Sequence, residues 1–286
     1  MKHDFIALLK YNTPLKLLLV VLAVAVLILL IFACDNRVYV RKYTLSSEKI
    51  SSNVRIALIT DLHSSKYGEK QSELLSAIEA QSPDLVLLGG DLFDHTLSDE
   101  NSKNFLSGIS GKYPCYYVTG NHEYYSDAEY FREKMSILES YGVKILSGEY
   151  ETVSVNGENI NICGVDDPIA NVDVSKSFSE QLKVVNTASQ NGFYTVLLSH
   201  RPEYFETYTT YDFDLVLSGH AHGGQWRIPF VLNGVFAPNQ GLFPKYAGGR
   251  YDGDTLTMIV SRGLSLKYVL IPRIFNRPEL VIIDIN

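Results

Sequence analysis

Five apolar runs in this chain end directly in aspartate, asparagine or histidine, and this repeated pattern limits the folds that the chain can adopt. The runs are RIALIT before Asp61, DLVLLGG before Asp91, CYYVTG before Asn121, TVLLS before His200 and FDLVLSG before His220. Continuous apolar runs of this length are typical of strands that are buried on both faces of a sheet. Because ligands bind beyond the carboxyl ends of strands in open α/β sheets, we expect these polar side chains to converge on one place.

Helical and hairpin patterns lie between the apolar runs. Residues 69–81 carry apolar side chains at helical spacing, and Ser126 with Glu129 predicts a capping box that opens a second helix. The alternating segment ETVSVNGENINICGV contains an Asn-Gly pair where a type I′ hairpin turn would fit. Together these patterns predict one layered α/β domain, built around sheets, over residues 54–286.

The N-terminal part of the chain reads as a separate unit. Residues 17–34 are eighteen apolar residues without a charge, and as a helix they would span roughly 27 Å, close to the hydrocarbon thickness of a bilayer. We therefore expect a tail over residues 1–16, an uncleaved transmembrane signal anchor over residues 17–35 and a polar tether over residues 36–53. A buried core helix is disfavoured because the run has no polar face. A lipoprotein signal ending at Cys34 is the remaining alternative.

The charged residues and the cysteines limit the partners that the chain could bind and the compartment in which the domain could lie. Basic residues flank the apolar run on both sides, so the positive-inside rule gives no clear orientation, and we expect the domain on the extracytoplasmic side of the cell membrane. The net charge of −7 offers no basic field for nucleic acid, and we expect no such partner. Cys34, Cys115 and Cys163 fit no CxxC pattern, and we expect Cys115 and Cys163 to be buried thiols rather than a disulfide.

The side chains at the strand ends are of the types that bind divalent transition metals. On an extended chain residues i and i+2 point the same way, which would pair Asp61 with His63 and His220 with His222. Carboxylate, imidazole and amide oxygen together suit Mn, Fe or Zn. The candidate ligands are Asp61, His63, Asp91, Asn121, His200, His220 and His222.

Seven protein ligands exceed the need of one catalytic ion that keeps an open position. We therefore predict two divalent ions, about 3.5–4 Å apart, that share one bridging carboxylate. Gly223 and Gly224 would then let the backbone pass close to the ions, where a Cβ atom would crowd it.

The motifs DLH, GGDLFD, GNHE, LSH and GHAH, in this order, resemble the motif set of the calcineurin-like metallophosphoesterase superfamily over residues 54–286. GHAHGGQ and the C-terminal SRGL and IPRIFNRPEL segments resemble a branch of small membrane-anchored bacterial phosphodiesterases, which includes relatives that hydrolyse UDP-diacylglucosamine. The resemblance implies a four-layer α/β-β-α sandwich with two metals between the sheets. It assigns one ion to Asp61, His63, Asp91 and His222, and the other ion to Asp91, Asn121, His200 and His220. Asp91 would be the bridge.

The resemblance also implies a catalytic residue that is not a ligand. It places His122 to protonate or stabilise the leaving oxygen, while two cations lower the pKa of a shared water so that a metal-bound hydroxide attacks phosphorus. Glu123 would orient His122 or cap the turn. His95 and Arg201 are weak candidates for substrate contact, and His3 is expected to be a bystander.

The predicted function is that of a metal-dependent phosphoesterase. We expect a phosphodiesterase or pyrophosphatase that acts on a lipid-linked or other membrane- or envelope-associated substrate, because an anchor confines the site near the bilayer. A phosphomonoesterase such as a protein phosphatase is one alternative. A non-catalytic scaffold is another, and the presence of both Asp91 and His122 disfavours it.

Overall fold

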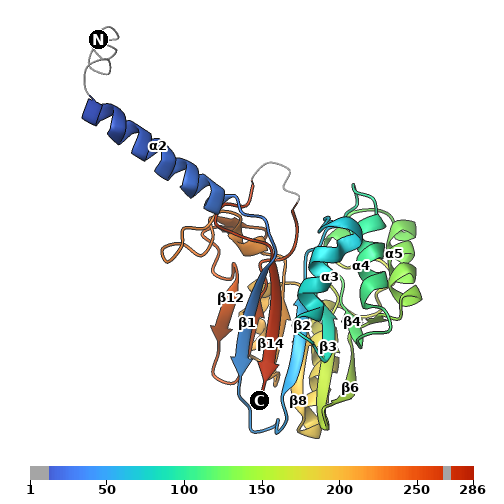
Figure 1. The fold of residues 1–286 in the computed structure, drawn as a ribbon. Coiled ribbons are helices and arrows are strands. Elements are labelled where there is room, and N and C mark those ends of the chain that lie inside the picture. The colour runs from blue at the N-terminus through green and yellow to red at the C-terminus, as the bar shows by residue number, and fades with distance from the viewer. Residues whose placement is uncertain (1–12, 267–271) are drawn as a thin grey trace.

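The computed structural model of the protein describes residues 13–266 and 272–286 (Figure 1). In this part of the chain, six strands form a first sheet in the order β1-β14-β2-β3-β4-β5, and six form a second sheet in the order β12-β13-β9-β8-β7-β6. The strands of the first sheet are β1 (Tyr39–Leu45), β2 (Val54–Ile59), β3 (Leu85–Leu88), β4 (Cys115–Tyr117), β5 (Lys144–Ile145) and β14 (Glu279–Ile285). The strands of the second sheet are β6 (Glu149–Val155), β7 (Glu158–Gly164), β8 (Tyr194–Leu198), β9 (Leu215–Ser218), β12 (Gly249–Asp252) and β13 (Thr257–Val260).

Helices cover the outer faces of the two sheets. The longer ones of the domain are α3 (Ser72–Glu79), α4 (Glu100–Ile109), α5 (Ala128–Ser140) and α6 (Phe178–Val185), with the short α7 (Phe205–Tyr208). Short 3₁₀ helices are η1 (Glu69–Gln71), η2 (His122–Tyr124), η3 (Asn186–Asn191), η4 (Pro202–Tyr204) and η5 (His222–Gly224). A small hairpin is formed by β10 (Phe236–Ala237) and β11 (Gly241–Leu242).

Three apolar cores hold these layers together. The central core lies between the two sheets and includes Leu58 of β2 and Leu217 of β9. A second core joins the first sheet to α3, α4 and α5, and a third joins the second sheet to α6 and α7. The strands β3, β4, β8 and β9 are buried throughout because each packs against a core on both faces. The predicted four-layer α/β-β-α sandwich is therefore confirmed.

The direction of the strands decides where their polar ends meet. In the first sheet β2, β3 and β4 run parallel, and in the second sheet β7, β8, β9 and β13 run parallel. Parallel strands end at one edge of their sheet, so the polar residues that follow β2, β3 and β4 form one group of loops. The residues that follow β8 and β9 form a second group, which packs against the first.

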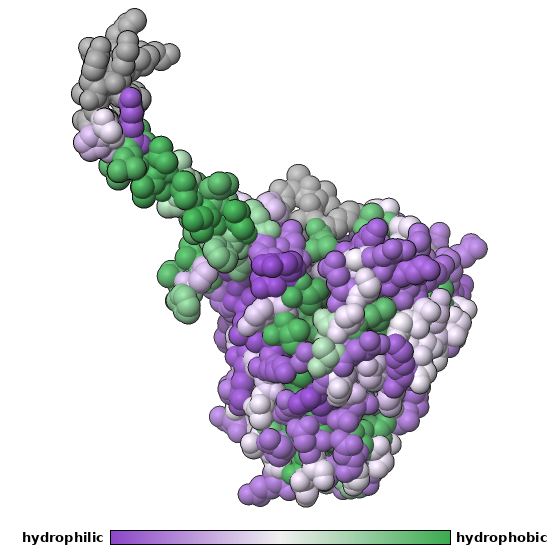
Figure 2. Space-filling model, in the orientation of Figure 1, coloured by the Kyte–Doolittle hydropathy of each residue, from purple (hydrophilic) through white to green (hydrophobic). Residues whose placement is uncertain are grey.

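The N-terminal helix differs in extent from the expected span. Helix α2 (Thr13–Ala33) begins before residue 17 and ends before residue 35, and the expected tail lies outside the described residues up to residue 12, together with His3. The described residues include one helix that is long and apolar enough to cross a membrane, and none of its most apolar window is buried against the protein. Figure 2 shows this helix as a hydrophobic rod that projects from a largely polar domain.

The prediction of a tether over residues 36–53 is wrong for its central part. Strand β1 pairs in parallel with β14 from Tyr39 to Leu45, and Leu45 is buried in the central core. β1 is the edge strand of its sheet, and edge strands commonly carry charged side chains that face solvent. The polar composition of YVRKYTL therefore reflects an edge strand and not a linker.

Local predictions mostly agree with the structure. The Asn-Gly hairpin turn is confirmed between β6 and β7, with positive φ at Asn156 and Gly157. The two internal cysteines are buried and unpaired, as expected. The predicted capping box of Ser126 and Glu129 is wrong, because the side chain of Asp127 caps α5 alone by accepting a hydrogen bond from the Tyr130 amide at 2.8 Å.

The pairing of β1 predicts a stability difference between two N-terminal truncations. A chain that starts at Asp35 keeps β1, whereas a chain that starts at Ser47 leaves the edge of β14 unpaired and loses the burial of Leu45. We expect the shorter chain to unfold at least about 5 °C lower, since each lost kcal/mol lowers the midpoint of such a domain by about 2–4 °C. Thermal unfolding followed by circular dichroism tests this, and equal midpoints would contradict the role of β1.

Candidate metal centre

The loops after the strands hold their polar residues in an unusual backbone conformation. Positive φ angles near 50° occur at five of the seven candidate ligands, which are Asp61, His63, Asp91, His220 and His222. Non-glycine residues adopt this left-handed region rarely, and such strain gathers at functional sites because the surrounding structure must maintain it. The strand ends are thus bent sharply toward a common point.

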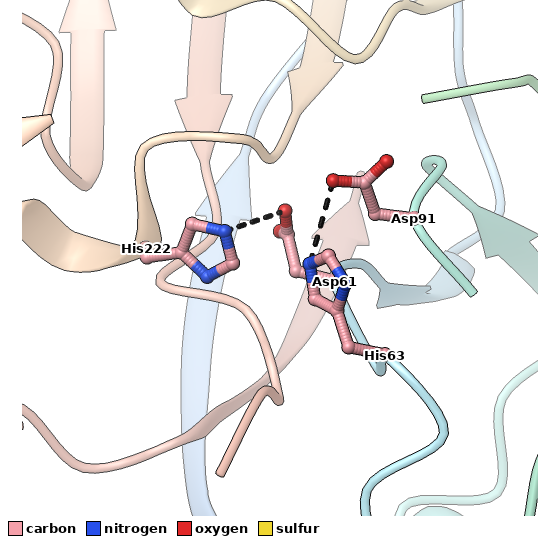
Figure 3. A group of neighbouring side chains, drawn as sticks. All are labelled: Asp61, His63, Asp91 and His222. Carbon is pink, nitrogen blue, oxygen red and sulfur yellow. Dashed lines mark ion pairs between the residues drawn. The ribbon is translucent and has the colours of Figure 1, made fainter. Parts of the chain in front are cut away.

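One group of candidate ligands lies between the ends of the first sheet and the loop after β9 (Figure 3). Its four residues offer ligand atoms that all lie within 4.8 Å of one another. The Nε2 atom of His63 is 3.4 Å from Oδ2 of Asp91, and the Nε2 atom of His222 is 3.6 Å from Oδ1 of Asp61. All four side chains are buried.

A second group shares Asp91 with the first. The Nε2 atom of His200 lies 3.3 Å from the same Oδ2 atom of Asp91, and it lies 3.2 Å from Nδ1 of His220. Nδ1 of His200 is 2.7 Å from the carbonyl oxygen of Gly89, so it donates there and leaves Nε2 as the ligand atom. Asn121 follows β4 at this edge and is 3 % exposed.

Several buried polar atoms of the site lack a hydrogen-bond partner in the described part of the chain, which suits the binding of a cation. Among the described residues, Oδ2 of Asp91 and Oδ1 of Asn121 are buried and accept no hydrogen bond, and neither ring nitrogen of His63 makes one. Unsatisfied buried polar atoms are costly in a folded protein, and a metal ion would satisfy all of them at once. Burial lowers the pKa of His63 to about 4, and it also lowers the pKa values of His220 and His222, which keeps these imidazoles neutral as metal ligation requires.

The expectation that His220 and His222 point the same way is wrong. His222 lies with Asp61 and His63, whereas His220 lies with His200, because the left-handed turns at positions 220 and 222 rotate the two side chains apart. The extended-chain argument also fails for Asp61 and His63, although the turn brings both of them to the same group.

Gly223 and Gly224 serve a different purpose from the one expected. Both have positive φ, and a Cβ atom on Gly223 would lie 2.2 Å from Oδ1 of Asn276. A Cβ atom on Gly224 would lie 2.4 Å from Cα of Gly234. These glycines therefore allow neighbouring protein segments to pack closely behind His222, and Asn276 fixes the loop by donating to the carbonyl oxygen of His222 at 2.7 Å.

His122 stands at the open side of the two groups. Its ring centroid is 4.3 Å from that of His63 and 4.8 Å from that of Tyr125, and its side chain is 23 % exposed. His95 is exposed and its ring centroid lies 5.4 Å from that of His122, so it belongs to the rim of the site. Asp94, which the sequence analysis did not single out, brings Oδ2 within 4.0 Å of Nδ1 of His122 and within 3.8 Å of Nδ1 of His63.

Arg201 is a buried support of the site. Its guanidinium donates to both carboxylate oxygens of Asp167, and its Nη1 atom lies 3.0 Å from Nε2 of His220. The side chain is 4 % exposed, so in this position it holds the His220 ring and does not face solvent. A substrate phosphate would therefore have to displace an ion pair to reach it.

Glu123 fixes the loop that carries Asp91. Its buried carboxylate accepts hydrogen bonds from the amide of Asp91 at 3.1 Å, the amide of Leu92 at 3.1 Å and the amide of Gly120 at 2.8 Å. Burial, and then the nearby charge of Asp91, raise the pKa of Glu123 to about 7. Glu123 therefore caps the turn at Gly120, one of the two expected roles, and also joins the loops after β3 and β4.

Replacement of Glu123 by glutamine should destabilise the protein. The amide nitrogen of glutamine cannot accept from the buried backbone donors, and a buried unsatisfied donor costs about 1–3 kcal/mol. Urea unfolding should show this loss in Glu123→Gln. The exposed Glu129→Gln on α5 is the matched control and should change stability by less than about 0.5 kcal/mol. Equal effects of the two substitutions would show that Glu123 does not anchor the loops.

Comparisons with known proteins agree with this geometry. A sequence profile of the calcineurin-like phosphoesterase family matches residues 54–224. The chain is 28 % identical over 285 residues to an uncharacterized metallophosphoesterase of Campylobacter jejuni, covering 96 % of this chain and 72 % of that protein. It is 28 % identical over 235 residues to phosphodiesterase YaeI of Escherichia coli, covering 81 % of this chain and 82 % of that protein.

Other relatives are longer than this chain. A metallophosphoesterase of Helicobacter pylori is 33 % identical over 193 residues, which cover 65 % of this chain and 48 % of that protein. Among solved structures, a 5′-nucleotidase precursor of Thermus thermophilus matches with a TM-score of 0.50 and 16 % identity, over 74 % of this chain and 49 % of that chain, and this likeness supports the fold alone. The profile match, the fold and the grouped metal-binding side chains have one explanation, which is that the chain belongs to the calcineurin-like phosphoesterase family.

Proposed function

We propose that this protein is a phosphodiesterase or pyrophosphatase that binds two divalent cations and acts on a membrane- or envelope-associated, lipid-linked substrate. The observation that carries the proposal is the position of Asp91 Oδ2, which lies 3.4 Å from Nε2 of His63 and 3.3 Å from Nε2 of His200. One carboxylate oxygen thus faces a histidine of each group. This arrangement suits a bridge between two ions.

The ligands of the two ions follow from the two groups. Asp61, His63, Asp91 and His222 would hold one ion, and Asp91, His200, His220 and Asn121 would hold the other. The mixture of carboxylate, neutral imidazole and amide oxygen suits Mn, Fe or Zn. When bound, the two cations supply a water of lowered pKa and positive charge beside the phosphoryl group.

The remaining groups of the site orient the substrate and move a proton. His122 lies at the open side, where its ring can donate a proton to the leaving oxygen. Asp94 approaches Nδ1 of His122 and can hold the orientation of the ring. His95 and Tyr125 lie on the same rim and add polar contacts for the part of the substrate that leaves.

The end of the domain at which the site lies supports a substrate at the membrane. β1 follows α2 after a short link, and its first residue, Tyr39, pairs with Glu279 of β14. The antiparallel pairing of β14 with β2 brings that end of the sheet beside Leu58, close to the Asp61 loop. The carboxyl end of β2, which the Asp61 loop follows, and the end of α2 therefore lie at the same edge of the first sheet. Figure 1 shows α2 joining the domain at this edge.

The membrane assignment itself rests on helix α2. A core helix of a soluble protein is mostly buried, whereas the apolar window of this helix is not buried at all. We therefore propose that α2 is a membrane anchor. The proposal also places the domain, residues 54–286 with β1 added, on the extracytoplasmic side. Exposure of this many apolar residues to water would be strongly unfavourable, and the hydrocarbon core of a bilayer would remove it.

Hydrolysis of bis-p-nitrophenyl phosphate tests the activity. We expect turnover by the full chain with Mn²⁺, loss of turnover after treatment with a chelator and dialysis, and recovery when Mn²⁺ is returned. The mono-ester, p-nitrophenyl phosphate, is the comparison and should react more slowly. Faster cleavage of the mono-ester would favour a phosphomonoesterase, and full turnover by protein that elemental analysis shows to be free of metal would refute the proposal.

His122→Ala separates proton transfer from metal binding. We expect kcat for the diester to fall about 10²–10⁴-fold, the usual contribution of a general acid, while the metal content by elemental analysis stays unchanged. Asp91→Asn is the contrasting variant and should lose metal as well as activity, because its carboxylate faces both groups. A His122→Ala protein as active as the parent would remove His122 from the mechanism.

A further inference from the structure

A cavity of about 460 Å³ lies on the domain near the end of α2, apart from the metal-binding side chains. Three arginines contribute to its wall, and they come from β1 and from the loops after η5 and β13. They are Arg41, Arg227 and Arg262. The remaining wall is mainly apolar and includes Ile228, Phe230, Val231 and Phe275.

The arginines carry more positive charge than their protein partners balance. Glu279 lies beneath the cavity, with Oε2 at 3.2 Å from Nε of Arg262 and at 3.7 Å from Nε of Arg41. Arg227 donates to two neutral acceptors, the carbonyl oxygen of Gly223 at 3.3 Å and the side-chain oxygen of Asn233. Three guanidinium groups against one carboxylate leave an excess of two positive charges.

Arg227 and Arg41 both lie in surroundings that disfavour an unpartnered guanidinium. Burial, and then the neighbouring charge of Arg262, lower the pKa of Arg227 to about 10. Nε of Arg41 is buried and makes no hydrogen bond to any described residue. An anion that accepts hydrogen bonds from these arginines would balance the positive charge around Arg227 and give Arg41 a hydrogen-bond acceptor. One guanidinium group can donate two hydrogen bonds to the oxygens of a phosphate.

The outer rim of the cavity is strongly apolar. Phe230 is fully exposed and Val231 is 79 % exposed. Leu242 and Phe243, in the adjoining β10–β11 hairpin, are 69 % and 67 % exposed. Figure 2 shows hydrophobic surface on the domain directly beside the end of α2. Large apolar side chains that are exposed together are typical of an interaction surface, because their contact with water is unfavourable.

The cavity is joined directly to the end of α2. Phe275, which lines it, donates its amide hydrogen to the carbonyl oxygen of Ala33, the last residue of α2, at 2.7 Å. Arg277 binds Asp35 at 3.3 Å and donates to the carbonyl oxygens of Arg37 and Val38. The position of the cavity relative to the helix end is therefore fixed by several contacts.

We propose that this cavity binds the headgroup phosphate of an anionic phospholipid, while the exposed side chains around Phe230 and Leu242 enter the adjoining acyl region. The proposal rests on the anchoring of α2 in a bilayer, because that anchoring sets the cavity at the level of the headgroups. Only about 5–8 Å of headgroup region lies outside the hydrocarbon core on each side, so a cavity bonded to the last turn of a spanning helix lies within it. Excess positive charge there favours an anionic over a zwitterionic lipid.

Native mass spectrometry of the full chain, released from neutral detergent, tests the lipid preference. The probes are dioleoyl phosphatidylglycerol and dioleoyl phosphatidylcholine, which share their acyl chains, so that contacts of α2 with the chains affect both equally. We expect the protein to retain phosphatidylglycerol at least about 25-fold better, because two arginine charges are in excess and each predicts a factor of about five. Equal retention of the two lipids would overturn the proposal, as would displacement of phosphatidylglycerol by an equal concentration of inorganic phosphate.

Variants of the cavity locate the binding. Arg41→Gln should weaken retention of phosphatidylglycerol about five-fold, and Arg41→Gln with Arg262→Gln should weaken it about 25-fold, while retention of phosphatidylcholine stays the same. Arg250→Gln, which removes an exposed arginine outside the cavity, is the matched control and should have no effect. If the double variant fails to fold, the single Arg41→Gln still decides, because that side chain is 35 % exposed on an edge strand.

Diester hydrolysis by the same preparations separates this inference from the proposed function. We expect bis-p-nitrophenyl phosphate turnover to be unchanged in the Arg41→Gln variant. Turnover without a lipid preference would refute the lipid site alone. A lipid preference without turnover in the parent protein would refute the proposed activity alone. Wild-type retention in both arginine variants would show that phosphatidylglycerol binds elsewhere.

Discussion

The candidate site depends on one buried carboxylate whose charge the protein itself does not fully pair. Asp91 Oδ2 faces His63 on one side and His200 on the other, yet accepts no hydrogen bond within the described residues. Its other oxygen accepts from the amide of His122 at 2.9 Å, so the residue that would move a proton is fixed to the residue that would bridge the ions. Glu123 holds the same loop from behind through backbone amides. Burial of such a carboxylate costs free energy, and a cation beside Oδ2 would offset that cost.

The layered fold brings two sets of strand ends face to face at the candidate site. Asp61 and Asp91 follow strands of the first sheet, whereas His200, His220 and His222 follow strands of the second. Packing of Leu58 and Leu217 in the central core sets the distance between those strands. Because packed cores are nearly incompressible, the sheets hold the strand ends rigidly. The loops in the left-handed conformation then turn the metal-binding side chains toward one another.

The apolar runs and the residues that end them are local features, and they were sufficient to predict the layers and the convergence of the candidate ligands. The division of those ligands into two groups came only from the family resemblance. The sequence was insufficient wherever the answer depended on a partner far away in the chain. Glu123 could not be recognised as an anchor for Asp91, because the backbone amides that donate to it lie about thirty residues earlier in a different loop. Asn276 gave no local signal that it would crowd Gly223 and hold the carbonyl oxygen of His222.

Strand β1 was not predicted from the sequence for the same reason. Its presence limits how far the domain can move from a membrane. A free tether of eighteen residues would let the domain move about 60 Å from the bilayer, since an extended chain covers about 3.4 Å per residue. With β1 in the sheet, only residues 34–38 separate it from α2, which limits the reach to about 17 Å. Arg277 and Phe275 bind even this short link to the domain. If α2 spans the bilayer as proposed, the domain cannot turn its metal-binding edge far from the lipid surface. A substrate embedded in the same membrane then reaches the site by diffusion in two dimensions, whereas a large soluble substrate has to enter the narrow space between the domain and the bilayer. With α2 in a bilayer, the short link would therefore favour lipid-linked phosphoesters on geometric grounds, independently of any contact within the site.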